Sequence, residues 1–503
     1  MSLPDWLEPL PDAAQMRATD AWAIETKGVP GLELMERAGE GLARVVAERV
    51  PAGRIALVCG KGNNGGDGFV AARLLRGAGR DVDVLALSPA EALSGDARAM
   101  LERLPGDAPA AFDAARLEAA QGIVDALLGT GSTGAPKDPV AGAIAAIGAA
   151  DATVIAADVP SGVDASTGEV ADAAVRAAAT ATFHRAKPGL WIAPGKAHAG
   201  AVSVVDIGIP DGAPEEAAAG LISGGVLGVM PRRGPESTKF SSGNVVIAGG
   251  SRGLTGAPSM SALAAVRAGA GYVTVAAPGS LELAFAVRLL EAMFAPLPED
   301  AGVLVPDALE PALAAMGRAG AVVLGPGLGR APGTQELARV LTQRIEVPLV
   351  IDADGLNALA GRLEKLRGRR APTVLTPHAG ELGRLLELDS GAIERARLRH
   401  ARAAAERAQA IVVLKGDDTI VAEPSGRVAI SPGGAPALAT AGTGDVLAGV
   451  TGAMLAKGMP ARHAACAAVY VHVRAGRLAA APHGPDAVIA SDVIAALPAA
   501  LSA

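Results

Sequence analysis

The chain has 503 residues, of which 45 are Lys or Arg and 52 are Asp or Glu, and its formal net charge is −7, so its length fits two or three domains. Aromatic residues make up only 2% of the sequence and no extended block of basic residues occurs, which argues against nucleic acid or an anionic membrane as a partner. Cys59 and Cys466 lie far apart in apolar surroundings, and neither a secretory signal pattern nor a long apolar run occurs, so we expect reduced thiols and a cytoplasmic protein without a membrane span.

The first half of the sequence alternates strand-like and helix-like segments. Four strands are predicted, at residues 54–60, 81–87, 122–128 and 152–158. A glycine-rich loop at residues 60–68 separates the first strand from a helix at residues 69–79. Strands that alternate with helices are typical of a parallel, doubly wound α/β sheet.

This alternation breaks at residues 210–220, where the sequence reads P-D-G-A-P-E-E-A-A-A-G. We therefore place a domain boundary there and predict two α/β domains, at residues 1–218 and 219–503. The alternation then restarts, with strands predicted at residues 244–250, 271–277, 321–325, 348–352, 373–376 and 411–415. A hairpin is predicted over residues 419–431, with E-P-S-G at residues 423–426 as its turn.

The loop after the first strand contains G-x-G-x-x-G at residues 60–65, the pattern that binds dinucleotides. A dehydrogenase of this class also needs an acidic residue at the end of the second strand to hold the ribose. Leu87 and Ser88 stand there instead. A dehydrogenase is therefore the least favoured interpretation of the loop.

Polar side chains gather at the predicted strand ends of the first half. They are Asn64, Asp67, Asp125 and Asp158. The carboxyl ends of parallel strands face the ligand crevice of such a sheet, so these side chains are expected to converge. Carboxylate, amide and hydroxyl oxygens without histidine or thiolate suit a hard cation.

The second half carries its most specific motif at residues 439–449, A-T-A-G-T-G-D-V-L-A-G. A glycine-rich turn that opens a helix points backbone N–H groups at one place, and the helix dipole adds positive charge there. This predicts a site for a phosphate or a developing anion. Asp445 stands at its edge, where it can take a proton from a nucleophilic hydroxyl.

Other glycine-rich or polar segments follow predicted strands of the second half, so they are expected at one edge of the sheet. They are residues 249–258, 325–329, 352–356, 376–381 and 413–416. His378 alone reads as a turn histidine that caps a neighbour, but it stands beside Glu381 and these loops. Neither a P-loop motif nor the protein-kinase motifs occur.

The first half resembles the NAD(P)H-hydrate epimerase domain, which is Rossmann-like. The motifs are G-K-G-N-N-G-G-D-G, V-D-A-L-L-G-T-G, D-V-P-S-G-V-D and K-P-G, and the resemblance covers roughly residues 10–215. It implies that the hydrate is bound by Asn63, Asn64, Gly65, Gly66, Asp67, Gly129, Thr130, Gly131, Ser132, Thr133, Gly134, Ala135 and Asp158. It also implies a potassium ion held by Asn64, Asp125 and Ser161.

The substrate of such an enzyme is a nicotinamide ring with water added at C6. Inversion of that carbon requires proton transfers, through ring opening or through loss and return of hydroxide. A carboxylate in the crevice can serve as general acid–base. We interpret Asp158 as that group, with Lys187 as its helper.

The second half resembles the ribokinase-like ADP- or ATP-dependent NAD(P)H-hydrate dehydratase over about residues 220–500. The family pattern H-P-G-E is replaced by H-A-G-E, which keeps the histidine and the glutamate. The resemblance implies hydrate contacts at Ala257, Gly327, His378 and Asp445, and nucleotide contacts at Lys415, Gly416, Asp417, Asp418, Thr419 and Gly444. The implied reaction transfers a phosphoryl group from ADP or ATP, with magnesium, to the C6 hydroxyl before elimination.

Together the halves predict a bifunctional repair enzyme that acts on NADH and NADPH hydrates and forms a homo-oligomer. An epimerase makes sense beside a dehydratase that accepts only one C6 epimer. One alternative is a ribokinase-like small-molecule kinase, for sugars or hydroxymethylpyrimidine, with a nucleotide-binding regulatory N-terminal domain. Another makes the N-terminal half a non-catalytic binding module, which the complete polar set around Asp158 argues against.

Overall fold

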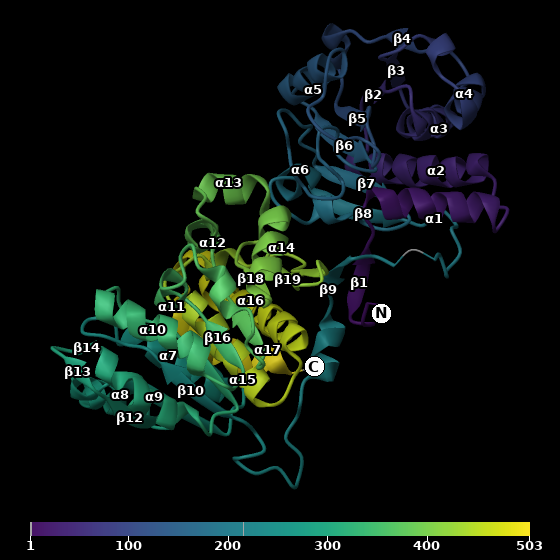
Figure 1. The fold of residues 1–503 in the computed structure, drawn as a ribbon. Coiled ribbons are helices and arrows are strands. Elements are labelled where there is room, and N and C mark those ends of the chain that lie inside the picture. The colour runs from purple at the N-terminus through teal and green to yellow at the C-terminus, as the bar shows by residue number, and fades with distance from the viewer. Residues whose placement is uncertain (1–2, 215, 503) are drawn as a thin grey trace. The chain divides into compact units, whose positions relative to one another are not determined.

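The computed structural model describes residues 3–214 and 216–502, and the chain forms two compact units (Figure 1). Among the described residues, the first unit comprises residues 9–214 and 216–220 together with residue 3. The second comprises residues 221–502 together with the short segment Pro4–Glu8. The chain therefore contributes a few residues to the second unit before it builds the first.

The first unit is built on a seven-stranded sheet in the order β4-β3-β2-β5-β6-β7-β8. Its strands are β2 (Ile55–Cys59), β3 (Val82–Ala86), β4 (Ala110–Ala111), β5 (Gly122–Ala126), β6 (Thr153–Ala157), β7 (Ala179–Phe183) and β8 (Ala201–Val205). Its helices are α1 (Ala13–Glu25), α2 (Gly31–Arg49), α3 (Asn63–Gly77), α4 (Gly95–Glu102), α5 (Val140–Ala149) and α6 (Lys196–Ala199). All strand pairs are parallel, so the predicted doubly wound sheet is confirmed.

The alternation of side chains along β2 sets the two layers of helices. Ile55, Leu57 and Cys59 pack in one core with residues of α2 and α3. Ala56 and Val58 face the other way, into a core with residues of α5. Successive strand residues point to opposite faces, so a strand that is apolar throughout must be covered on both sides.

An eleven-stranded sheet has the order β1-β9-β20-β19-β18-β17-β16-β15-β10-β11-β12, and its strands from β20 to β12 belong entirely to the second unit. Its strands are β1 (Leu7–Leu10), β9 (Ala219–Ile222), β10 (Asn244–Ala248), β11 (Tyr272–Pro278), β12 (Met293–Leu297), β15 (Ala321–Leu324), β16 (Leu349–Ile351), β17 (Thr373–Leu375), β18 (Ile411–Leu414), β19 (Ile420–Ala422) and β20 (Val428–Ile430). The strands from β18 to β12 pair in parallel, and the predicted hairpin is confirmed as the antiparallel pair β19–β20. A separate short hairpin joins β13 (Glu299–Asp300) to β14 (Val303–Leu304).

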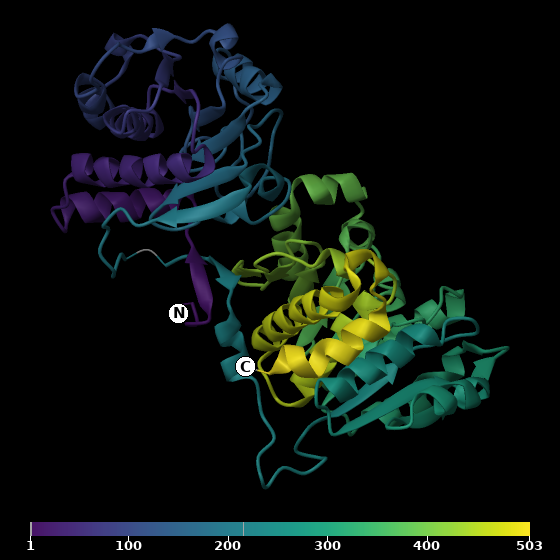
Figure 2. The same ribbon diagram turned by 180° about the vertical axis from the view of Figure 1, so that it is seen from behind.

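Helices cover this second sheet as well. They are α7 (Gly256–Arg267), α8 (Glu282–Arg288), α9 (Leu309–Met316), α10 (Pro332–Arg344), α11 (Asp354–Asn357), α12 (Ala379–Leu386), α13 (Ser390–Arg395), α14 (Arg397–Ala408), α15 (Thr443–Ala456), α16 (Ala461–His483) and α17 (Ala490–Leu501). Figure 2 shows the yellow C-terminal helices packed side by side over the sheet. A Cβ at Gly449 of α15 would lie 2.1 Å from the carbonyl oxygen of Ser261 in α7, so these two helices approach more closely than any larger residue permits.

The N-terminal segment was not predicted as part of the second sheet. Trp6 is buried, and its ring makes an edge-to-face contact with His463 at 5.3 Å between centroids. The backbone N–H of Ser223 donates to the carbonyl of Trp6 at 3.0 Å. Pairing of β1 with β9 joins residues more than two hundred positions apart, which local sequence patterns do not reveal.

The predicted strands of both halves are confirmed to within a few residues. The strands that were not predicted are β4, β7 and β8 of the first sheet, together with β1, β9, β12, β13 and β14. The predicted loop at residues 60–68 is wrong in its second part, because α3 already begins at Asn63. Its glycines serve close packing: a Cβ at Gly65 would lie 2.0 Å from the carbonyl oxygen of Gly60, and one at Gly66 would lie 2.6 Å from Met35 Sδ. Among the described residues, no helix is long and apolar enough to cross a membrane.

Candidate active sites

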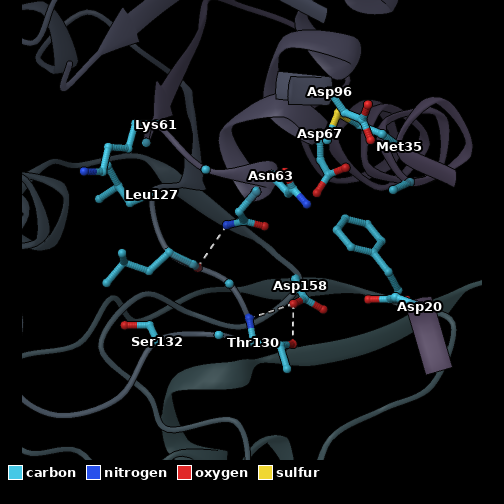
Figure 3. Close-up of a pocket in the computed structure, with 18 of the residues that line it drawn as sticks. Asp20, Met35, Lys61, Asn63, Asp67, Asp96, Leu127, Thr130, Ser132 and Asp158 are labelled. Carbon is cyan, nitrogen blue, oxygen red and sulfur yellow. Dashed lines mark hydrogen bonds between the residues drawn. The ribbon is translucent and has the colours of Figure 1, made fainter. Parts of the chain in front are cut away.

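A pocket of about 800 Å³ opens in the first unit where the order of the strands reverses (Figure 3). Strand β2 has β3 on one side and β5 on the other. The chain therefore leaves β2 and β5 toward opposite neighbours, which opens a crevice at their carboxyl ends. Residues 60–64 and 127–132 form two of its walls.

Most residues predicted to bind the hydrate lie in this pocket. The lining includes Asn63, Asn64, Asp67, Gly129, Thr130, Gly131, Ser132, Asp158 and Lys187. The buried glycines of α3 and residues 133–135 lie outside the lining. The glycine-rich segments at residues 60–68 and 129–135 thus meet in one pocket, although only some residues of each segment line it.

Asp158 is the most tightly held side chain of the pocket. It stands directly after β6 with a backbone φ of 64°, a left-handed conformation that is costly for a residue with a side chain and that often marks functional sites. Lys187 Nζ donates to its Oδ1 at 2.5 Å, and the backbone N–H and hydroxyl of Thr130 donate to its Oδ2 at 2.9 and 2.5 Å. Burial disfavours the carboxylate, but Lys187 and Thr130 outweigh burial, so the pKa of Asp158 is lowered.

Lys187 is itself 1% exposed. Its ammonium group also donates to the hydroxyl of Thr182 at 2.9 Å and to the carbonyl of Phe183 at 3.0 Å. A buried ammonium needs such partners, because an unpaired charge there would be very costly. The three acceptors fix Lys187 against Asp158 and leave its position little freedom.

Asn64, which lines the pocket, forms a second polar cluster with Asp125 and Ser161. The hydroxyl and N–H of Ser161 donate to the two oxygens of Asp125 at 2.6 and 2.8 Å, and Asn64 Nδ2 donates to the carbonyl of Leu128 at 2.9 Å. The Oδ1 atom of Asn64 is buried and has no hydrogen-bond partner among the described residues. Burial raises the pKa of Asp125 to about 6, although its bonds with Ser161 oppose the shift.

Two further carboxyl groups of the pocket have raised pKa values. Asp67 of α3 is buried, and burial together with the nearby charges of Asp158 and Asp20 raises its pKa well above the ordinary value. Asp20 of α1 also lines the pocket, and burial raises its pKa to about 6. Asp20 was not among the residues predicted from the sequence, although the helical spacing of Met16, Asp20 and Ile24 places them on one face of α1.

The predicted residues of the second half lie at the carboxyl ends of parallel strands. Strand β15 leads to Gly327, β17 to His378 and β18 to Lys415, while Ala257 lies in the first turn of α7 after β10. The backbone of Gly327 has a φ of 63° and passes so close to Leu254 that a Cβ would lie 2.3 Å from its carbonyl oxygen. One edge of the sheet thus collects these loops, as predicted.

Lys415 is the hub of the charged groups there. Its Nζ donates to Asp352 Oδ1 at 3.1 Å and lies 3.6 Å from Glu381 Oε2. Thr376 donates a further hydrogen bond to Asp352 Oδ1 at 2.7 Å. Burial alone would lower the pKa of Lys415, but the charges of Asp352 and Glu381 raise it, so the ammonium stays charged.

Asp445 stands in the first turn of α15, which begins after Gly442 in the left-handed conformation with a φ of 90°. No described residue donates a hydrogen bond to its carboxylate. Burial, followed by repulsion from Asp352, raises its pKa to about 7. A Cβ at Gly444 would lie 3.4 Å from Lys415 Nζ, so the turn of α15 and the lysine face the same space.

His378 caps α12, as the plainer interpretation of that residue held. Its Nδ1 accepts from the N–H of Gly380 at 3.0 Å, and Glu381 Oε2 accepts from the N–H of His378 at 2.9 Å. The side chain is 55% exposed. The exposed part of the ring remains free to contact a ligand while Nδ1 caps the helix. The contact between His378 and the hydrate therefore stays a prediction.

Residues 415–419 form a loop whose side chains mainly shape the loop itself. Asp418 is buried and accepts from Nε of the buried Arg397 at 2.9 Å. Asp417 accepts from the N–H of Gly434 at 2.9 Å, and the hydroxyl of Thr419 donates to the carbonyl of Gly416 at 2.7 Å. Apart from the side chain of Lys415, the backbone is therefore the part of this loop that is available to a nucleotide. Sequence reasoning missed Arg397, which carries no motif.

Two family matches cover both units. Residues 245–499 match the family described as NAD(P)H-hydrate dehydratase, and residues 31–189 match the family described as YjeF-related protein N-terminus. The chain is 41% identical over 520 aligned residues to a protein of Salinibacter ruber and 39% identical over 504 to one of Moorella thermoacetica. Each alignment covers 97% of this chain and 95% of the relative, and both relatives are named bifunctional NAD(P)H-hydrate repair enzyme Nnr.

Solved structures resemble the second unit. An ADP/ATP-dependent NAD(P)H-hydrate dehydratase from Bacillus subtilis, co-crystallised with ATP and Mg²⁺, is 29% identical, with a TM-score of 0.49, and covers 55% of this chain and 94% of its own. A ribokinase-like superfamily protein from Enterococcus faecalis is 27% identical, with the same TM-score, over 56% of this chain and 95% of its own.

The architecture defines a two-unit α/β protein, with a doubly wound parallel sheet in the first unit and a largely parallel sheet in the second. With near-complete alignments at about 40% identity, the chain belongs to the family of bifunctional NAD(P)H-hydrate repair enzymes.

Proposed function

We propose that this chain repairs hydrated nicotinamide nucleotides in two steps. The first unit interconverts the R and S forms of NADH or NADPH hydrate at C6, and the second dehydrates the S form at the expense of ADP or ATP. The observation that carries the proposal is the alignment with bifunctional repair enzymes over 97% of the chain. The kinase alternative accounts for only one unit and gives the first no reaction.

The pocket of the first unit supplies what epimerisation needs. Because C6 carries a hydroxyl and is bonded to the ring nitrogen, it can lose hydroxide and regain water on the other face. Asp158, kept ionised by Lys187 and Thr130, is our proposed base for the incoming water. If Asp158→Asn keeps full epimerase activity, this assignment fails.

We propose a potassium ion in the polar cluster of Asn64, Asp125 and Ser161. The donor set fits, since it offers carboxylate, hydroxyl and amide oxygens and the buried Asn64 Oδ1 lacks a partner. When bound, potassium would supply positive charge that offsets Asp125 beside the pocket.

In the second unit, Asp445 is our proposed base. It would take the proton of the C6 hydroxyl while the hydroxyl oxygen attacks the terminal phosphorus of ADP or ATP, and the N–H groups of residues 442–444 would stabilise the transferring phosphoryl. Lys415, held by Asp352 and Glu381, is placed to neutralise phosphate charge. Magnesium bound with the nucleotide supplies further charge neutralisation.

The phosphoryl transfer makes the later elimination possible. Hydroxide is a poor leaving group, whereas phosphate is a good one. Departure of phosphate from C6 and of a proton from C5 restores the double bond of the reduced nicotinamide. We propose that Ala257, Gly327 and His378 contact the hydrate and that residues 415–419 and Gly444 contact the nucleotide, because all of these lie at the same sheet edge as Asp445.

The test is recovery of reduced nicotinamide absorbance from a mixture of both hydrate epimers, with purified protein, magnesium, potassium and ADP or ATP. Complete recovery is expected, and comparison of the nucleotides identifies the donor. Recovery that stops near the fraction of one epimer would refute the epimerase half of the proposal. No recovery with either nucleotide would refute the repair function and favour the small-molecule kinase.

We further propose a cytoplasmic homo-oligomer. Both cysteines are buried and free, in keeping with a reducing compartment. Light scattering of the purified protein tests the oligomer, and a monomer at working concentration would contradict it.

A further inference from the structure

The first unit contains a carboxyl group that belongs to none of the recognised motifs. Asp20 lies on α1, which precedes the region matched to the N-terminal family at residues 31–189. Met16, Asp20 and Ile24 line the pocket together, because residues four apart share a face of a helix. Helix α1 thus adds a wall to the pocket, and Asp20 is the acidic group of that wall.

Asp20 faces the charged groups of the proposed epimerase centre. Figure 3 shows the carboxyl groups of Asp20, Asp67 and Asp158 pointing toward a shared space. Asp158 is bonded to Lys187 and Thr130, whereas no described residue donates a hydrogen bond to Asp20. The carboxyl oxygens of Asp20 are therefore available to a ligand in the pocket.

Inversion at C6 needs two proton-transfer groups. The departing hydroxyl must gain a proton on one face of the ring, and the incoming water must lose one on the other. The same requirement places an acid and a base on opposite sides of the sugar in inverting glycosidases. Asp158 can fill only one of these roles in a given turnover, so a second group must fill the other.

Asp20 fits the acid better than Asp67 does. A group that transfers a proton works best when its pKa lies near the working pH, and burial raises the pKa of Asp20 to about 6, with the charges of Lys187 and Asp158 acting in opposite directions. The deeper burial of Asp67 raises its pKa well above the ordinary value. Asp67 is therefore suited to stay neutral and donate a hydrogen bond to the substrate.

We propose that Asp20 is a catalytic residue of the epimerase, the general acid that protonates the departing C6 hydroxyl. Its carboxylic acid gives the proton, the C6–O bond breaks, water leaves, and the ring nitrogen lone pair forms a C=N bond with C6. A water molecule then attacks C6 from the other face, the C=N pair returns to nitrogen, and Asp158 accepts the released proton. Exchange with solvent restores both groups. This assignment rests on the proposed epimerase function.

The test uses the full chain with a mixture of both epimers. Dehydration of the S form gives a fast phase of absorbance recovery, and epimerisation of the R form limits a slow phase. Asp20→Asn is expected to slow the second phase by about 10²–10⁴-fold and to leave the first unchanged. Glu25→Gln, at an exposed position of the same helix, is the matched control and should leave both phases unchanged.

The pH dependence of the slow phase distinguishes a catalytic role of Asp20 from a structural one. In the wild type, the slow phase should weaken as pH rises through about 6, because Asp20 must hold its proton. Asp67, Asp158, Asp96, Lys187 and Arg17 also face or flank this pocket, so the comparison is made with Asp20→Asn, in which this limb should disappear. Asp20→Glu should restore part of the rate.

An unchanged slow phase in Asp20→Asn would overturn the proposal, and so would a change in KM alone. Equal loss in Asp20→Asn and Asp20→Glu with a lowered melting temperature would assign Asp20 a structural role and overturn it as well. Absence of the slow phase from the wild type would instead mean that the proposed epimerase function is wrong.

Discussion

Both units place an aspartate and a lysine at the carboxyl ends of parallel strands, yet the two pairs behave in opposite ways. In the first unit, Lys187 donates directly to Asp158 at 2.5 Å, and the pKa of that carboxyl is lowered. In the second unit, Lys415 donates to Asp352 instead, and the pKa of Asp445 is raised to about 7. Burial raises the pKa of Asp445, whereas direct hydrogen bonds from Lys187 and Thr130 overcome burial at Asp158, so the contrast points to the hydrogen-bond partner of each lysine as the deciding factor.

This contrast suits the two proposed reactions. A carboxylate held ionised by an ion pair is a weak but always available base, and it also gives a fixed charge to the pocket. A carboxyl with a pKa near 7 is a stronger base once it is ionised, which suits removal of a proton from an alcohol. Lys415 is bonded to Asp352 and lies close to Glu381. Its positive charge therefore lies near Asp445, but Lys415 and Asp445 do not form an ion pair.

The largest expected effect is that of Asp445→Asn. Loss of the proposed base should slow dehydration by about 10²–10⁴-fold, measured as recovery of reduced nicotinamide from the S epimer. Epimerisation, followed by chromatographic separation of the R and S forms, should persist at the wild-type rate. Loss of both reactions would indicate a folding defect, and retention of dehydration would remove Asp445 from the mechanism.

Lys187→Met tests the ion pair of the first unit, in which Lys187 keeps Asp158 ionised. Removal of one partner leaves Asp158 buried without its counter-charge, which costs about 3–5 kcal/mol in other proteins. We expect a lower free energy of unfolding for the first unit at neutral pH and a smaller loss at acid pH, where Asp158 becomes protonated. Denaturant unfolding at two pH values measures this. A loss that is the same at both would show that the ion pair does not hold the charge of Asp158.

A third change separates the stability of the two units. Trp6→Ala removes a buried ring from the second unit and should cost that unit about 3 kcal/mol of unfolding free energy. Differential scanning calorimetry should show one transition lowered and the other unmoved. Glu8→Gln, at an exposed position of the same segment, is the control. An unchanged thermogram would mean that the segment 4–8 does not stabilise the second unit.

The smallest effect concerns pH. Because Asp445 must be ionised to act and its pKa is about 7, the dehydration rate should fall as pH drops through 7. One pH unit below the pKa, about a tenth of the groups are ionised, so about a tenth of the plateau rate is expected there. Single-turnover dehydration of the S epimer across this range measures it. A rate that is flat down to the ordinary aspartate range would contradict the raised pKa.

Much of the fold was predictable because local sequence carries it. Strand β2 and its glycine-rich turn, or β18 and Lys415, follow from apolar runs bounded by turn residues. Strand β7, with the sequence A-T-A-T-F, was missed because small residues give it little apolar pattern. The pairing of β1 with β9 was missed because it depends on contacts far apart in the chain.

The site was predictable only in part, for a similar reason. Residues on recognisable turns, such as Thr130 and Asp158, are brought together by neighbouring strand ends, and the sequence anticipates this. Which carboxyl Lys187 or Lys415 would contact depends on angstrom-scale packing that no motif encodes. Asp20 belongs to a helix before the first predicted strand, so nothing local connects it with the pocket.

The most direct test of the contrast is a pH titration followed by NMR of protein labelled with ¹³C at the aspartate carboxyl carbons. Comparison with Asp158→Asn and Asp445→Asn assigns the two signals. We predict that the Asp445 signal shifts near pH 7, while the Asp158 signal shifts only below the ordinary aspartate range. Titration of both carboxyls in the ordinary range, or in the reverse order, would contradict the account.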